Sequence, residues 1–169
     1  MQISDLVEAS LANVSRATGR VLKDLSQQEL GFCPKADCNS IGFLYFHMAR
    51  FEDGFMLEKI LGKKSLWESQ KWYEKMNMPV EENAGGYTVE RLARFKVPDI
   101  KVLQAYYEAV RAELIQTLKM IDSSQLDRII KLPWGENTAG GMLAMSITHQ
   151  AEHAGEMSYI RGMQKGMNK

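Results

Sequence analysis

The chain has 169 residues, 45% of them hydrophobic and 25% charged, which is the composition of a globular protein with one domain over residues 1–169. Its 21 basic residues balance its 21 acidic residues, and this zero formal charge argues against nucleic acid or an anionic membrane surface as a partner. Charges interrupt every apolar run before it reaches the length of a membrane span, and the N-terminus lacks the pattern of a secretion signal, so a cytoplasmic location is expected.

The chain opens with a predicted helix over residues 3–26. Apolar residues recur there at helical spacing: Ile3, Val7, Leu11, Val14, Val21 and Leu25. Residues 27–37 contain glycine and proline and are predicted to form a loop. Cys33 and Cys38 could form a local disulfide or add metal ligands. Two cysteines alone are a weak signal for either, so both are expected to be free and dispensable.

A second helix is predicted over residues 39–61, with Asn39 or Ser40 as its N-cap and Gly62 after its end. His47 shares one helical face with bulky apolar residues: Phe43, Leu44, Phe51 and Phe55. We therefore expect its imidazole to point inward, where it needs a partner.

Residues 63–98 are the least regular part of the chain. A short helix is predicted over residues 66–76, and four prolines and glycines interrupt the remainder: Pro79, Gly85, Gly86 and Pro98. Connections of this length usually carry function or cover a site. The aromatic residues Trp67, Trp72 and Tyr73 could contact a substrate, but the favoured interpretation is that they pack on the flank of the helices.

The last two predicted helices cover residues 99–122 and 138–163, capped by Asp99 and Thr138. Between them, residues 129–136 contain a short extended run that a turn at Trp134 and Gly135 closes. Because no segment shows a convincing strand pattern, the four amphipathic helices predict an all-α protein built as a four-helix bundle.

The three histidines of the chain are the candidate metal ligands. His149 and His153 are four residues apart, so they lie on the same helical face, and His47 is on another predicted helix. Three imidazoles would leave an ion one open position for water or substrate, as catalytic zinc sites do. A histidine pair at this spacing is more often a packing or surface feature. A metal site is nevertheless favoured because the chain uses every histidine here.

These motifs, in this order, resemble the DinB-like (YfiT-like) superfamily of metal-binding four-helix bundles. The resemblance rests on Phe46-His47-Met48-Ala49-Arg50-Phe51-Glu52-Asp53, on Leu132-Pro133-Trp134-Gly135-Glu136 and on His149-Gln150-Ala151-Glu152-His153-Ala154-Gly155-Glu156. It implies an up-down-down-up bundle with a long crossover between helices two and three, one divalent ion bound by three histidines, and a homodimer. A homodimer is also expected from apolar residues that a four-helix core would leave partly uncovered, such as Leu11, Leu22 and Tyr106. Members with an assigned activity are mostly transferases or isomerases that use a low-molecular-weight thiol. Glu156 stands where Gln often occurs, which affects the surroundings of the ligands.

Such a site suits the activation of a nucleophile, because a zinc or nickel ion with three neutral imidazoles lowers the pKa of a bound thiol or water. Glu152 and Glu156 could orient imidazoles or accept a proton. An exposed surface charge is the simpler interpretation of Glu152, and Glu52 is equally ambiguous between a role in the site and a surface charge. The sequence therefore predicts a metal-dependent transferase, isomerase or hydrolase acting on a small molecule. The alternative is a non-catalytic module in which the ion, or the histidines alone, fixes the helix packing.

Overall fold

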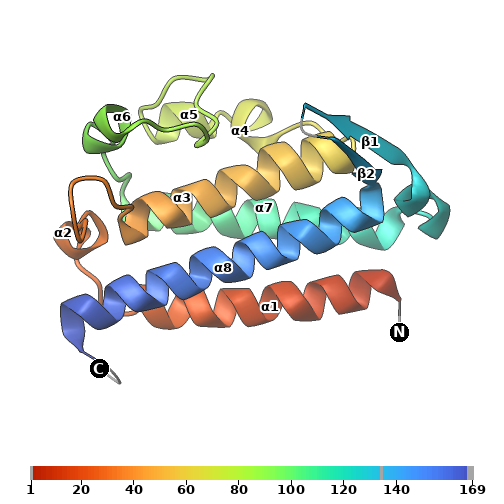
Figure 1. Ribbon diagram of the computed structural model, residues 1–169. Coiled ribbons are helices and arrows are strands. Elements are labelled where there is room, and N and C mark those ends of the chain that lie inside the picture. The colour runs from red at the N-terminus through yellow and green to blue at the C-terminus, as the bar shows by residue number, and fades with distance from the viewer. Residues whose placement is uncertain (1, 134, 167–169) are drawn as a thin grey trace.

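The computed structural model describes residues 2–133 and 135–166 and is mostly helical, with a small two-stranded sheet. Four long helical segments lie side by side (Figure 1): α1 (Ile3–Leu22), α3 (Ile41–Phe51) continued by the π-helix η1 (Glu52–Ile60), α7 (Ile100–Met120) and α8 (Ala139–Lys165). α1 packs on α7 and α8, and α3 and η1 pack on the same two helices. Among the described residues, no helix is long and apolar enough to cross a membrane.

Short elements occupy the connections. They are α2 (Gln27–Leu30), α4 (Leu66–Ser69), α5 (Trp72–Lys75), α6 (Val89–Ala93), the 3-10 helix η2 (Ser123–Asp127), β1 (Ile129–Leu132) and β2 (Gly135–Thr138). The two strands pair antiparallel, with Ile130 opposite Asn137. The expectation that the chain has no strand is therefore wrong at this hairpin. The turn predicted at Trp134 and Gly135 falls partly on Trp134, which lies outside the described residues.

The helical character of the four predicted stretches is confirmed, and their ends differ for local reasons. The first helix stops at Leu22 instead of residue 26, because Asp24 has a left-handed backbone (φ 57°) that no α-helix continues. Side-chain oxygens of Ser40, Asp99 and Thr138 accept hydrogen bonds from the first turns of α3, α7 and α8, as their sequence positions predict. The second stretch changes from α-helix to π-helix after Phe51.

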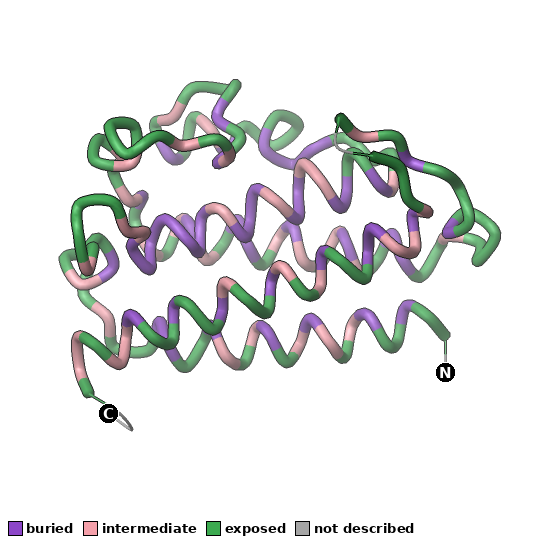
Figure 2. Tube along the Cα trace, in the orientation of Figure 1, coloured by how far each residue is buried: buried purple, intermediate pink, exposed green. Residues whose placement is uncertain are grey.

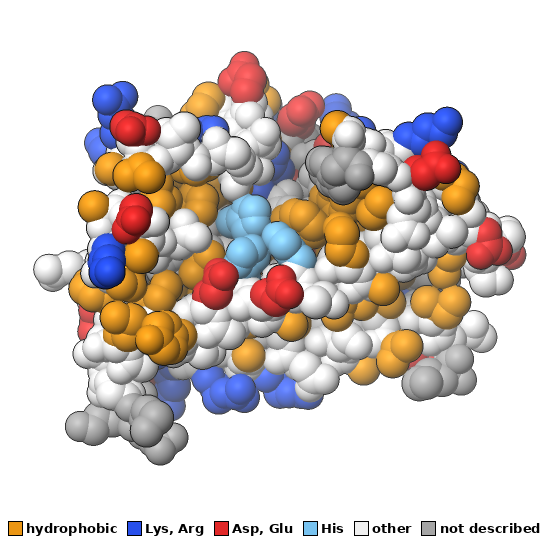
Figure 3. Space-filling model, in the orientation of Figure 1, with side chains coloured by type: hydrophobic (Ala, Val, Ile, Leu, Met, Phe, Trp, Pro, Cys, Tyr) orange, Lys and Arg blue, Asp and Glu red, His pale blue; other side chains and the backbone are white. Residues whose placement is uncertain are grey.

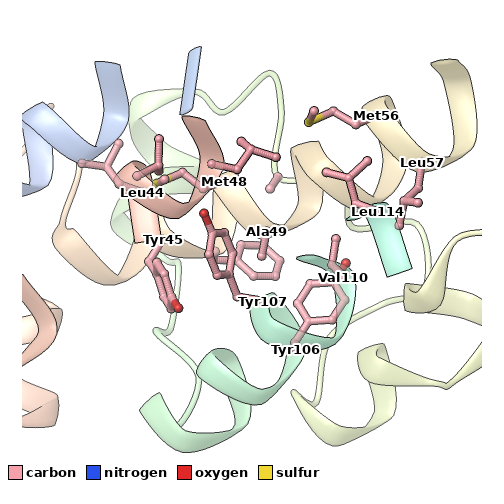
Figure 4. Packing of buried hydrophobic residues seen from close by; sticks show 14 of the residues in the cluster. Leu44, Tyr45, Met48, Ala49, Met56, Leu57, Tyr106, Tyr107, Val110 and Leu114 are labelled. Atoms are coloured by element: carbon pink, nitrogen blue, oxygen red, sulfur yellow. The ribbon is translucent and has the colours of Figure 1, made fainter. Parts of the chain in front are cut away.

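The apolar faces of the long helices meet in one core. Figure 2 shows buried residues recurring along the long helices, whereas the connections are largely exposed. Figure 4 shows part of this packing, in which α3 and η1 contribute Leu44, Tyr45, Met48, Ala49, Met56 and Leu57, and α7 contributes Tyr106, Tyr107, Val110 and Leu114.

Three residues that we expected to lie on an uncovered apolar surface are instead part of this core. Leu11 and Tyr106 are 0% exposed and Leu22 is 7% exposed. Leu11 and Leu22 belong to the face that α1 turns toward α7 and α8, and Tyr106 lies beneath Trp67 and Trp72 of the crossover. A homodimer therefore draws no support from these residues.

Two acidic side chains at the start of η1 are fully buried. Glu52 pairs with Arg111 of α7, whose guanidinium also donates to the Leu11 carbonyl oxygen at 2.7 Å and to Ser15 Oγ at 2.9 Å. Asp53 accepts hydrogen bonds from the backbone N–H groups at the start of α4, from the Tyr106 hydroxyl and from Arg50. Glu52 therefore joins η1 to α7 and α1, and Asp53 fixes the beginning of the crossover.

Candidate metal centre

The structure brings the three predicted ligands together. His47 comes from α3, and His149 and His153 come from successive turns of α8. The Nε2 atom of His149 lies 3.2 Å from Nε2 of His47 and 3.1 Å from Nε2 of His153. Figure 3 shows the imidazoles gathered at the surface beside hydrophobic and acidic side chains. Each histidine is partly buried, so the cluster is shielded on the protein side and accessible from solvent.

The protonation states of the rings follow from the partners of their other nitrogens. The Nδ1 atom of His47 lies 2.8 Å from the Ala84 carbonyl oxygen, and Nδ1 of His153 lies 2.7 Å from Glu156 Oε2. Both oxygens are acceptors, so both Nδ1 atoms carry a proton, and in the neutral form of each ring the Nε2 atom presents a lone pair. This is the arrangement in which metal-binding histidines are held by carbonyl or carboxylate partners.

The convergence of the Nε2 atoms fits a cation better than a hydrogen-bond network. A single proton on Nε2 of His149 can donate to His47 or to His153, and the Nε2 lone pair of the other ring would then face this nitrogen without a hydrogen bond. By contrast, two imidazole nitrogens that share a tetrahedral zinc ion are separated by about 3.3 Å, given Zn–N distances of about 2.0–2.1 Å. The observed separations are close to this value, so the residues present fit a divalent ion.

His149 is oriented by packing instead of by a hydrogen bond. Its ring stacks on Phe51 with 3.9 Å between centroids and 22° between planes. Its buried Nδ1 atom has no hydrogen-bond partner among the described residues. Burial, with the charges of His153 and His47, lowers the pKa of His149 to about 4. The ring therefore stays neutral at physiological pH, as a metal ligand must.

The carbonyl that orients His47 is itself held in a strained position. Ala84 is buried and has a left-handed backbone (φ 58°), which is unfavourable for a residue with a side chain. The Glu82 carboxylate accepts a hydrogen bond from the Ala84 N–H at 2.7 Å. It also accepts one from the Tyr87 hydroxyl at 2.8 Å and two from Arg91 at 2.9 Å. These bonds connect the crossover to the histidine cluster, and we call Glu82, Ala84, Tyr87 and Arg91 the crossover clamp.

The charge of Glu82 is stabilised inside the protein. Burial raises the pKa of Glu82, but the hydrogen bonds from Ala84, Tyr87 and Arg91 and the positive charge of Arg91 outweigh it, so the pKa is lowered overall. The Arg50 Nε atom donates to the Glu82 carbonyl oxygen at 3.0 Å, which ties the clamp to α3 as well. Glu82 is thus an ionised, buried residue within two residues of the carbonyl that binds His47.

The other predicted acidic residues differ in their placement. Glu156 contacts His153, as expected, whereas Glu152 is exposed and makes no hydrogen bond or ion pair with the described residues. Glu52 lies away from the site, in its buried pair with Arg111. Sequence reasoning missed Glu82 and Ala84, because neither belongs to a periodic pattern and a backbone carbonyl leaves no mark in a sequence.

Comparisons with known proteins show the fold and the family of the chain. The chain is similar to the conserved protein of a locus from Enterococcus faecalis, whose crystal structure superposes with a TM-score of 0.85 at 24% identity, covering 96% of this chain and 97% of the other. This similarity shows the fold. No curated protein matches the chain. The family model of the DinB superfamily matches residues 11–157, a range that includes all three histidines, and the chain therefore belongs to the DinB superfamily.

Proposed function

We propose that His47, His149 and His153 bind one divalent ion, zinc or nickel, in a single domain with the up-down-down-up four-helix-bundle topology. The observation that carries this proposal is the convergence of three Nε2 atoms while two of the opposite nitrogens donate to protein oxygens. Neutral imidazoles suit either metal, and cellular availability often decides between them.

We further propose that the protein is a metal-dependent enzyme for a small-molecule substrate, either a transferase or isomerase that uses a low-molecular-weight thiol, or a hydrolase. When bound, the ion supplies a Lewis acid that favours the deprotonated form of a thiol or water. Side chains of the protein orient the ligands and shield the site around this ion. Glu156 orients His153 and is placed to accept a proton, and the rings of Phe43 and Phe51 flank His47 and exclude water from one side of the site.

A non-catalytic role is the second candidate, and it rests on the position of the ligands. His47 belongs to α3 and contacts the crossover, whereas the other two ligands belong to α8. An ion at this point would therefore join three parts of the fold and stabilise their packing. A homodimer remains part of the proposal, on the family resemblance, and a cytoplasmic location remains part of it as the expectation from the sequence.

Turnover assays separate the two functions. Protein purified without a polyhistidine tag is analysed for metal, then assayed with a panel of thiols and electrophiles before and after chelation. Turnover that disappears on chelation and returns with zinc or nickel supports the enzyme. A large fall in melting temperature on chelation, with no turnover for any thiol or water, supports the structural role. His153→Ala serves as the variant that lacks one ligand.

A further inference from the structure

A groove of about 680 Å³ lies beside the histidines, within the size range of small-molecule sites. Its walls are the C-terminal half of α8, the start of α3 and the loop of residues 34–39, which meet at one end of the molecule (Figure 1). We call it the α8 groove. It was not predicted from the sequence, because the loop contributes to it without any periodic pattern.

The α8 groove adjoins the candidate metal centre through Glu156. Glu156 lines the groove and also accepts the hydrogen bond from His153. On the opposite wall, Leu44 lies one helical turn before His47. The groove therefore begins about 5 Å, or one helical turn, from the ligands.

The groove exposes large apolar side chains to solvent. Tyr159 is 73% exposed and Met163 is 54% exposed, although both line a concave surface whose deeper residues, Leu44 and Ile160, are buried. Apolar walls with a few polar groups are typical of sites for small organic molecules. The polar groups here are Glu156, which contacts His153, and Lys35, Asp37 and Asn39 of the loop.

Gly155 lines the groove next to Glu156, two residues after His153. It lies in the interior of the long helix α8, where glycine is less favourable than alanine. A Cβ atom at this position would meet nothing within 4 Å, so helix packing does not require glycine. A larger side chain there would enter the groove, and the absence of one leaves room for a ligand.

We propose that the α8 groove binds the apolar body of an elongated small molecule whose polar head reaches the three-histidine site. This inference rests on the proposed metal site and adds the class of substrate: an amphiphile with a head that can contact a metal ion and an extended hydrocarbon part. The wall from Gly155 to Met163 is about 12 Å long, which suits a medium-length alkyl chain.

Two hydroxamic acids of different length test the inference by calorimetry on the zinc-loaded protein. Acetohydroxamate presents the metal-binding head alone, and octanohydroxamate adds the hydrocarbon chain. Each methylene that becomes fully buried is worth about fourfold in affinity, so partial burial in an open groove should make octanohydroxamate bind on the order of a hundredfold more tightly. Equal affinities would overturn the inference while leaving the metal site intact.

A matched pair of glycine variants locates the hydrocarbon chain. Gly155→Leu should reduce the affinity advantage of octanohydroxamate over acetohydroxamate to less than about threefold. It should change neither the affinity for acetohydroxamate nor the zinc content. Gly19→Leu is the control, because Gly19 is an exposed glycine inside α1 where an added Cβ atom would also meet nothing within 4 Å, and it does not line the groove. If Gly155→Leu disturbs zinc binding, Met163→Ser at the far end of the groove takes its place and should also reduce the gain.

The remaining outcomes are distinguishable. If the wild-type protein binds no zinc, the proposed function fails and the inference fails with it. If both glycine variants and Met163→Ser keep the full gain in affinity of octanohydroxamate over acetohydroxamate, the hydrocarbon chain binds elsewhere. The assignment of the groove is then wrong. If Gly155→Leu converts a homodimer into a monomer in light scattering, the groove is an interface between two copies and the inference is overturned.

Discussion

Replacing Glu82 with glutamine should weaken metal binding, although Glu82 does not contact a histidine. The substitution removes the negative charge that pairs with Arg91, and it replaces one of the two carboxylate oxygens, which together accept from Ala84 N–H, Tyr87 and Arg91, by an NH2 group that cannot accept. The left-handed conformation of Ala84 costs about 1–2 kcal/mol and persists only while the crossover clamp holds it. Once it relaxes, the Ala84 carbonyl moves away from Nδ1 of His47.

The magnitude follows from the contacts. Removing the partner of a metal-binding histidine typically lowers metal affinity about 10- to 100-fold, and we expect that range for Glu82→Gln. The Arg91 side chain is 43% exposed, so solvent screens its pair with Glu82 and the cost in stability should be modest. A loss of about 1–2 kcal/mol corresponds to a melting temperature lower by roughly 2–8 °C in a chain of this length.

Competition with a chromophoric chelator gives the zinc affinity, and thermal unfolding of the metal-free protein gives the stability. Glu81→Gln is the control, because Glu81 is the exposed neighbour of Glu82. It should change neither quantity. If Glu82→Gln lowers the melting temperature as expected but leaves zinc affinity within about twofold of the wild type, the clamp does not position His47 and the reasoning is refuted.

Three further predictions concern stability and the thiols. Asp53→Ala should destabilise the protein by about 3–5 kcal/mol in urea unfolding, because it leaves the buried Arg50 guanidinium without its ion pair; a loss below about 1 kcal/mol would contradict this. The Cys33→Ser/Cys38→Ser double variant should keep its metal content, because both thiols are free; elemental analysis that shows a loss would refute it. Since the pKa of His149 is lowered to about 4 from 6.5, the unfolded chain takes up a proton that the folded chain does not, so metal-free protein should lose stability as pH falls from 6.5 to 4; a melting temperature constant over that range would argue against it.

The sequence predicts the parts of this fold that rest on local patterns. The helices follow from apolar residues at helical spacing, and the caps at Ser40, Asp99 and Thr138 follow from their hydroxyl or carboxylate side chains. The i,i+4 spacing of His149 and His153 also places both rings on one face. These features depend on residues close in the chain, which is why they are predictable.

The features that the sequence does not predict depend on contacts between distant segments. Glu52 and Asp53 resemble surface charges in the sequence, yet both are buried by contacts with other elements of the fold. Arg111 of α7 pairs with Glu52, and Tyr106 of α7 and the start of α4 donate hydrogen bonds to Asp53. Ala84 is an ordinary residue until the clamp forces its backbone into the left-handed region. The burial of Leu11 likewise cannot be predicted from the local sequence, because it depends on the packing of α1 against α7 and α8.

Metal binding by His153→Ala is the most direct test of the central claim, that His47, His149 and His153 bind one divalent ion. Zinc and nickel affinities are measured for this variant and for Glu8→Ala, whose exposed side chain pairs with Lys119 away from the site. His153→Ala should lose most of the metal and keep its helical content by circular dichroism, whereas Glu8→Ala should lose none. In the wild type, occupancy should fall as pH drops through the range where imidazoles take up protons. Wild-type affinity weaker than about 1 mM for both metals, or equal affinity without His153, would contradict the account and make the histidine cluster a packing feature.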